Sequence, residues 1–362
     1  MNIFFRTLQV ILLIQLTFIK GFGQDLDTRR SYVCYIKTEE LTLDGLLEED
    51  SWKAAPWSQE FLDIEGPGKP TPNHRTRMKM LWDENYLYIG VHLEEPNLWA
   101  TYKERESVIF QENDIELFLD PDGDTHNYYE LEVNAMGTEW DLMLTKPYRN
   151  GGRAINGWNI NGLRQAIHLD GTLNDSRDTD NFWTIEMAIP WKSLSQSGPS
   201  FHVPKDGDQW RINFSRVQWQ TKPDPQGYQK KTNPQTGKPF PENNWVWSPM
   251  GIVDMHLPHR WGFVQFSTLK AGVEMVPFQP SPDEPVKDGL RRLYDLQLAH
   301  FEKNNKFAVN LEELGAIDIG LDQVEFEVSA TRYKLSSPSV IKGDWWYITE
   351  DSRIWKAKSP PN

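Results

Sequence analysis

The chain has 362 residues, with 52 acidic against 38 basic side chains and a net charge of −14. This balance argues against nucleic acid or an anionic membrane as a partner, since both are bound by clustered Lys and Arg. Cys34 is the only cysteine, so no disulfide can form within the chain, and burial alone must hold together one large and one small domain.

The first 23 residues have the pattern of a secretory signal peptide. Arg6 provides a short positive segment, an apolar run follows, and Gly21 and Gly23 place small residues just before Gln24. The apolar run is too short for a stable membrane span, and no other run approaches the required length. We therefore expect an exported protein, periplasmic or extracellular, that does not span a membrane.

Residues 24–270 hold a series of short segments in which apolar and polar side chains alternate, which is typical of strands with one buried face. The clearest are residues 75–82, 86–95, 114–120, 128–137, 138–145, 163–171, 181–190, 209–219 and 260–267, and residues 41–45 are also strand-like. No long helical pattern interrupts them. The sequence predicts an all-β fold, a β-sandwich of the jelly-roll or immunoglobulin-like type.

Two segments rich in Pro interrupt this rhythm. Residues 220–250 predict a long surface loop ahead of Trp245 and Trp247, and residues 271–289 predict an interdomain linker. Beyond the linker, residues 290–305 show helical spacing of apolar side chains, and residues 307–315 predict a second, short helix that ends at a Gly. With strands expected at 323–335 and 344–355, residues 290–362 predict a small C-terminal α+β module, which is a candidate surface for a protein partner.

Alternation along the strands also predicts which polar side chains share a face. Four strands carry such a set: Asp114, Glu116, Phe118 and Asp120; Glu130, Glu132 and Asn134; Arg75, Arg77 and Lys79; and Arg211, Asn213 and Ser215. If these strands are neighbours, one sheet presents a face of mixed charge. Such a face is either simply solvated or a polar binding surface that needs aromatic side chains at its rim. The 16 tryptophans supply enough aromatic side chains for both a core and a sugar-binding surface.

Three segments carry a resemblance to a known family. Residues 81–91 (LWDENYLYIGV), 113–124 (NDIELFLDPDGD) and 183–191 (WTIEMAIPW) resemble the core of the family 9 carbohydrate-binding modules. The resemblance extends over about residues 38–268. It implies a β-sandwich that clamps a terminal sugar between two Trp rings, with acidic, basic and amide side chains bonded to the sugar hydroxyls.

The resemblance assigns this chain's residues to those positions. Phe110 stands at the first clamp position, and Met255 or its neighbour His256 stands at the second. Glu116 matches the acidic residue, and Glu132 stands where the family has an Arg. An Arg side chain offers several N–H donors, whereas an ionised Glu side chain only accepts hydrogen bonds. Glu132 at this position therefore implies a sugar whose hydroxyl pattern differs from that of terminal glucose.

An oligo- or polysaccharide is thus the expected partner, with Tyr228, Trp245 or Trp247 as a replacement stacking surface from the long loop. The predicted sugar-binding residues are Phe110, Glu116, Glu132, Asn134, Arg211, Asn213, Trp247 and Met255.

Asp120, Asp122 and Asp124 alternate three carboxylates in one turn, which predicts a calcium site built from hard oxygen ligands. Related modules also bind structural calcium. The alternative is a turn whose Asp and Gly residues satisfy only turn geometry.

The predicted function is non-catalytic glycan binding in polysaccharide capture or carbohydrate catabolism. One alternative is hydrolysis of O-glycosyl bonds by a pair of carboxylates on the sheet, drawn from Glu116, Glu130, Glu132 and Glu186. The other is a structural or protein-interaction domain that has lost the sugar.

Overall fold

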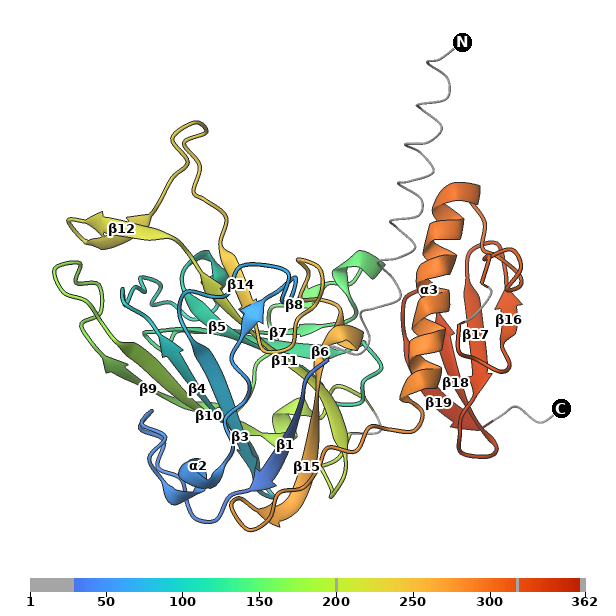
Figure 1. Ribbon diagram of the computed structural model, residues 1–362, viewed down its shortest axis with the longest axis horizontal. Helices are drawn as coiled ribbons and strands as arrows, with labels where there is room; N and C mark the ends of the chain where they lie inside the picture. Colours follow the sequence, from blue (N-terminus) through green and yellow to red (C-terminus); the bar gives the residue numbers. More distant parts are fainter. Residues whose placement is uncertain (1–28, 199–200, 317–318, 359–362) are drawn as a thin grey trace.

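The computed structural model describes residues 29–198, 201–316 and 319–358, so the predicted signal peptide lies outside the described residues. A β-sandwich and a smaller C-terminal module lie side by side (Figure 1). None of the helices in the described residues combines the length and the apolar character needed to cross a membrane.

Thirteen of the described strands join into one hydrogen-bonded sheet that folds over into two layers. The layer that carries the candidate site consists of β8 (Ala154–Ile155), β7 (Glu139–Leu144), β6 (Tyr128–Asn134), β5 (Asp114–Asp120) and β11 (Gln209–Gln218), with β14 (Asn243–Val246) and β2 (Leu62–Asp63) beyond β11. The second layer consists of β1 (Ser31–Ile36), β3 (Thr76–Trp82), β4 (Tyr86–Glu94), β10 (Phe182–Pro190) and β9 (Arg164–Asp170). β15 (Gly262–Lys270) pairs with both β11 and β1 and so joins the two layers.

The main core lies between the two layers. Ile115 and Leu117 of β5 pack in the same cluster as Ile89 of β4 and Ile185 of β10, and each of these side chains is at most 1% exposed. The alternation read from the sequence therefore buries one face of each strand in this core. The predicted all-β sandwich is confirmed.

The second layer is covered on its outer side by α2 (Asp50–Ala54). The indole N–H of Trp52 in this helix donates to Glu186 of β10 at 2.6 Å. The prediction that Arg75, Arg77 and Lys79 share a face with the polar residues of β5 and β6 is wrong, because β3 lies in the opposite layer. Lys79 donates instead to the carbonyl of Trp52 beneath α2.

Several predicted boundaries differ from the structure. Residues 41–45 form no strand, and residues 307–315 form turns rather than a second helix. The long loop of residues 220–250 contains a hairpin of β12 (Thr221–Asp224) and β13 (Gly227–Lys230), followed by β14. The helix α3 (Glu284–Asn304) begins inside the predicted linker, because Pro285 stands in the first turn, where a helix tolerates it.

The C-terminal module consists of α3 packed on a four-stranded antiparallel sheet. The strands are β16 (Glu325–Val328), β17 (Tyr333–Pro338), β18 (Asp344–Thr349) and β19 (Ile354–Lys358). Residues 323–335, expected as one strand, form β16, a turn and the start of β17. Leu290 and Leu293 of α3 enter the same buried cluster as Leu335 and Ile348, which confirms the predicted α+β character.

Charged side chains fasten this module to the sandwich. Arg29 contacts Asp288 at 2.7 Å and Glu284 at 3.3 Å, and Arg211 of β11 also pairs with Glu284. Burial alone would raise the pKa of Glu284, but Arg211 and Lys287 bring it below its usual value.

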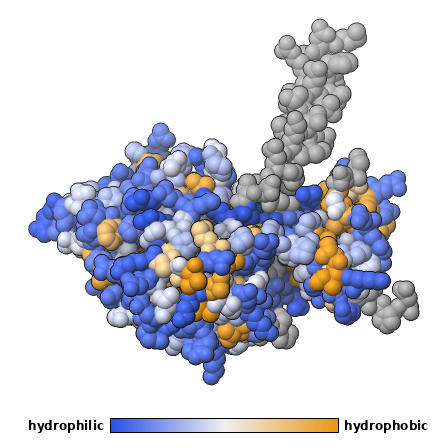
Figure 2. Space-filling view, turned by 60° about the horizontal axis from the view of Figure 1, so that its bottom comes forward, coloured by the Kyte–Doolittle hydropathy of each residue, from blue (hydrophilic) through white to orange (hydrophobic). Residues whose placement is uncertain are grey.

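The surface in view is mainly hydrophilic on both units, in keeping with the charged composition (Figure 2).

Replacing Glu284 by Gln should therefore destabilise the chain, because it leaves the buried guanidinium of Arg211 without its counter-charge. We expect the free energy of unfolding to fall by about 3 kcal/mol, measured by urea denaturation. Glu274→Gln, in the exposed segment before α3, is the matched control and should leave the free energy unchanged. Equal effects of the two substitutions would contradict a stabilising role for the buried pair.

Candidate functional site

A pocket of about 390 Å³ opens on the face of β5, β6 and β7 that points away from the main core. Its lining combines carboxylates with aromatic and apolar side chains. The lining residues are Ile64, Phe110, Glu116, Phe118, Glu130, Glu132, Trp140, Leu142, Tyr148, Asn244, Val253, Asp254, Met255 and His256.

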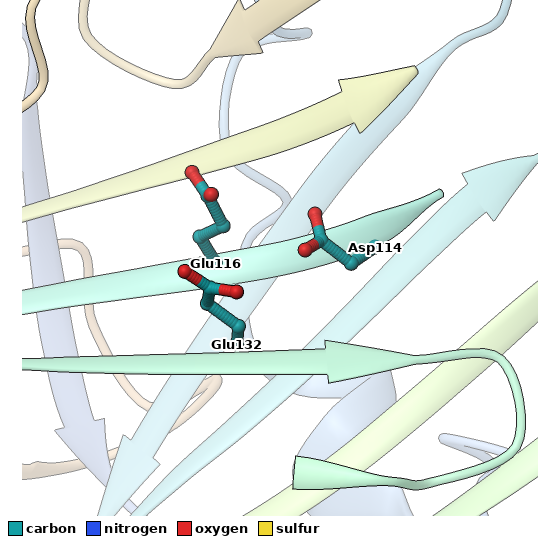
Figure 3. A group of neighbouring side chains, drawn as sticks. All are labelled: Asp114, Glu116 and Glu132. Carbon is teal, nitrogen blue, oxygen red and sulfur yellow. The ribbon is translucent and has the colours of Figure 1, made fainter. Parts of the chain in front are cut away.

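Strand register sets the polar part of this pocket. In the antiparallel pairing, Glu116 of β5 lies opposite Glu132 of β6, and Glu132 lies opposite Trp140 of β7. Side chains directly opposite each other on one face are close neighbours, so two carboxylates and an indole form one row. Figure 3 shows the carboxyl groups of Glu116, Glu132 and Asp114 gathered where β5 and β6 pair.

Aromatic rings lie at the side of this row. Phe110 belongs to the short 3-10 helix Ile109–Gln111, and its backbone N–H donates to Glu132 at 2.9 Å. Its ring is 38% exposed and lies nearly parallel to that of Trp140, at 26° with ring centroids 6.3 Å apart. The carboxylate of Glu132 therefore holds in place the segment that presents an exposed aromatic ring.

A second aromatic group contributes to the pocket lining. Tyr148 is 46% exposed, and its ring meets the His256 ring at 71° with centroids 4.5 Å apart. Burial lowers the pKa of His256 to about 4, so the imidazole is neutral at pH 7. Its Nδ1 lies 3.0 Å from the Tyr128 hydroxyl. These rings offer flat apolar surfaces next to polar groups, which suits a ligand with both apolar and hydroxyl faces.

The carboxylates of the pocket lie close together and are almost fully buried. Burial raises the pKa of Glu116 to about 7, with a contribution from Glu242, although the hydroxyl of Ser215 acts in the opposite direction. Burial and the charge of Glu116 also raise the pKa values of Glu130 and Glu132 well above the usual range. Part of the cluster is therefore protonated near neutral pH, so it can donate as well as accept hydrogen bonds.

Asp114 lies two residues before Glu116 on the same face of β5, close to the carboxylates of Glu116 and Glu132, and does not line the pocket. Burial and Glu116 raise its pKa well above the usual range, and the backbone N–H of Val217 acts in the opposite direction. No Lys or Arg is among the groups that shift the pKa of Asp114 or of Glu116, Glu130 and Glu132. The negative charge at this position therefore lacks a basic partner among the described residues.

The structure brings four of the predicted sugar-binding residues to this pocket: Phe110, Glu116, Glu132 and Met255. Their contact with a sugar stays a prediction. Met255 is only 8% exposed and packs in an apolar cluster with Phe118 and Trp261, so it contributes more to the wall than to the rim.

The other four predicted residues lie away from the pocket lining. Asn134 is fully buried and donates to Glu112 at 2.7 Å, in the segment that directly follows Phe110. Asn213 donates to the carbonyl of Ser248 at 2.8 Å. Arg211 is engaged by Glu284 of α3, and Trp247 is 1% exposed within the main core. Each of these four side chains is therefore bonded to, or packed against, other residues of the protein and stabilises the fold.

The long loop does not supply the replacement stacking surface either. The hydroxyl of Tyr228 donates to the carbonyl of Asp175 at 3.1 Å, and Trp245 is 4% exposed in the main core. Trp140 and Tyr148 supply the additional aromatic surface instead, and sequence reasoning missed both. For Trp140 a signal existed, because the hairpin from residue 128 to 145 in antiparallel register places it beside Glu132. Tyr148 lies in a short 3-10 helix (Tyr148–Asn150) after β7, where no strand periodicity predicts its direction.

The acidic loop after β5 has a different set of partners. One oxygen each of Asp120, Asp122 and Asp124 can lie within 4.8 Å of the others, a spacing that fits calcium. However, Asp120 accepts from the backbone N–H of Gly123 at 3.1 Å, and Asp124 accepts from Arg353 of the C-terminal module at 2.9 Å. Asp122 accepts from the backbone N–H of Asp124 at 3.4 Å, so all three carboxylates are already bonded within the protein. Calcium at this loop stays a prediction.

The raised pKa of Glu116 predicts how stability depends on pH. Because the folded pKa of about 7 exceeds the unfolded one, this group favours the folded state fully below about pH 4 and loses that contribution as pH rises through 7. The free energy of unfolding of the wild-type protein should therefore fall by a few kcal/mol between about pH 5 and 8, relative to that of Glu116→Gln. Urea denaturation at a series of pH values measures this, with Glu48→Gln at an exposed position as the control. A parallel pH dependence in wild type and Glu116→Gln would show that Glu116 does not titrate in this way.

Comparison with known proteins identifies the family. Residues 43–265 match the family described as "Carbohydrate family 9 binding domain-like". Exoglucanase XynX of Acetivibrio thermocellus is 28% identical over 118 residues, which are 32% of this chain and 9% of that protein. Endo-1,4-beta-xylanase A of Thermoanaerobacterium saccharolyticum is 28% identical over 120 residues, which are 33% of this chain and 8% of that protein. The chain spans less than a tenth of the length of either relative.

Among solved structures, a family 9 carbohydrate-binding module from Caldicellulosiruptor kristjanssonii, in complex with cellotriose, is similar with a TM-score of 0.38 and 15% identity. The similarity covers 68% of this chain and 100% of that one. The family match covers more than half of the chain and confirms the expected resemblance. The chain therefore belongs to the carbohydrate family 9 binding domain-like family.

Proposed function

We propose that the pocket on β5, β6 and β7 binds a neutral sugar unit of an oligo- or polysaccharide without cutting it. Membership of a carbohydrate-binding family confirms non-catalytic carbohydrate binding at the level of the family. The observation that carries the proposal for this pocket is the stacked pair of the exposed Phe110 ring and the half-buried Trp140 ring beside the buried carboxylates of Glu116 and Glu132. A sugar ring needs both an apolar surface for its C–H face and polar groups for its hydroxyls.

The charge of the pocket supports a neutral ligand. Glu116, Glu130 and Glu132 line it, and the chain carries a net charge of −14. An acidic sugar would meet like charge at the floor and in the surrounding field. A neutral glycan instead finds acceptors where a carboxylate is ionised and donors where it is protonated.

The proposal extends to the setting of the protein. We propose that it is exported and takes part in polysaccharide capture or carbohydrate catabolism, in the periplasm or outside the cell. The signal-peptide pattern of residues 1–23 and the names of the curated relatives, an exoglucanase and a xylanase, support this role.

Calorimetric titration of the full chain against neutral oligosaccharides, including glucose, cellotriose and xylo-oligosaccharides, tests the proposal. Phe110→Ala and Trp140→Ala should each weaken binding about fivefold to tenfold, because each removes one aromatic surface from the pocket. Phe240→Ala is the matched control, since this half-buried ring lies in the loop before β14 and outside the pocket lining.

Two results would contradict the proposal. Heat of binding from no glycan in the panel would favour a structural or protein-interaction domain. Release of new reducing ends by wild type, abolished in Glu116→Gln, would favour hydrolysis by the close pair of Glu116 and Glu132. Glu186, considered above for such a pair, lies in the opposite layer and is bonded to Trp52.

A further inference from the structure

The row of carboxylates on β5 and β6 contains one acid whose burial is not explained by the fold. Asp114 is 1% exposed, and neither of its carboxylate oxygens makes a hydrogen bond of normal geometry. Figure 3 shows its carboxyl group turned toward those of Glu116 and Glu132. Burying an acid without hydrogen bonds is costly, so such a group calls for a partner that the polypeptide does not supply.

A second unpartnered polar group lies beside the row. The hydroxyl of Ser215 on β11 is fully buried and makes no hydrogen bond of normal geometry, although it lies close enough to Glu116 to lower the pKa of that acid. Ser215 lies directly opposite Glu116 in the pairing of β11 with β5, and its hydroxyl points to the same face. Two neighbouring strands thus direct unsatisfied oxygen atoms toward one position.

The spacing of the three carboxylates fits a metal ion. One oxygen each of Asp114, Glu116 and Glu132 can lie within 4.8 Å of the others, about twice the 2.3–2.6 Å length of a Ca²⁺–oxygen bond. All candidate ligand atoms are oxygens, which favours a hard cation over a transition metal. Calcium suits the site better than magnesium, because it accepts irregular geometry and a larger number of oxygen ligands.

We propose that Asp114, Glu116 and Glu132 hold a divalent cation of the calcium type between β5 and β6. Glu116 and Glu132 also line the pocket, whereas Asp114 lies behind them. The ion would thus sit at the pocket floor, with its remaining coordination positions directed to the pocket. Vicinal sugar hydroxyls could fill them, a step that rests on the proposed function.

This arrangement explains the position of Glu132, which stands where the family resemblance places an Arg. In the family, an Arg side chain at this position brings positive charge to the sugar site; here a bound metal ion would bring it instead. With the ion bound, the charge of the Glu132 side chain and its buried neighbours is compensated, and a positive group again faces the ligand.

Calcium titration of the EDTA-treated full chain tests the cation site without any sugar. Wild type should bind Ca²⁺ saturably in calorimetry, and Ca²⁺ should raise its thermal midpoint. Asp114→Asn should weaken Ca²⁺ binding by ~tenfold or more, because it removes one charged ligand. The thermal midpoint of the metal-free variant should lie at or above that of metal-free wild type, since a buried charge has been removed, and this measurement also shows that the variant folds.

Asp122→Asn is the matched control, because it removes the one exposed carboxylate of the acidic loop and leaves Asp114, Glu116 and Glu132 intact. It should keep the Asp114-dependent binding. Absence of saturable Ca²⁺ binding in wild type would overturn the inference. So would a loss of binding in Asp122→Asn with none in Asp114→Asn, which would assign calcium to the loop.

Repeating the glycan titrations with Ca²⁺ and with EDTA separates this inference from the proposed function. A glycan that binds at least tenfold more tightly with Ca²⁺ supports coordination of sugar hydroxyls by the ion. Equal glycan binding in EDTA would overturn the role of the ion in sugar binding and leave carbohydrate binding intact. Ca²⁺ binding through Asp114 without binding of any glycan would support the cation site and contradict the proposed function.

Discussion

The antiparallel pairing of β5 with β6 is the constraint on which the candidate site depends. It sets Glu116 against Glu132 and, through β7, places Trp140 beside them. A shift of one residue in this register would turn the carboxylates toward the main core, where their burial would be prohibitive. Ile115, Leu117, Leu131 and Val133, which alternate with the acids, fix the register by entering that core. The apolar face of the two strands therefore determines where the polar face lies.

A second set of charged contacts shows how supporting residues differ from site residues. Arg211 and Asp124 look in sequence like ligand-binding groups, yet both are bonded to the C-terminal module, through Glu284 and Arg353 respectively. The module thus docks on Arg211 of β11 and on the acidic loop that follows β5. The pocket of about 390 Å³ is lined by other residues and remains separate from these contacts.

Much of the fold could be predicted from the chain because strand alternation is a local signal. The segments at β3, β4, β5, β6, β7, β9, β10, β11 and β15 were all expected, since each has an apolar face of period two. β1, β2, β8, β12, β13 and β14 were missed as strands, and the start of α3 was hidden by the Pro-rich composition before it. The site was predicted in part: Phe110, Glu116, Glu132 and Met255 meet in one pocket, but the family positions gave no indication of Trp140 or Tyr148.

The sequence by itself determined the fold class, the acidic charge, the family and the face on which each polar side chain of a strand lies, because these depend on residue type and short-range spacing. Only the tertiary structure decided which strands are neighbours. The strand order places Arg75, Arg77 and Lys79 in the opposite layer and pairs Arg211 with Glu284 of α3. It also buries Asp114 beside Glu116 without a hydrogen bond of normal geometry. Contacts between strands distant in the chain are set by packing of the whole core, which no local pattern encodes.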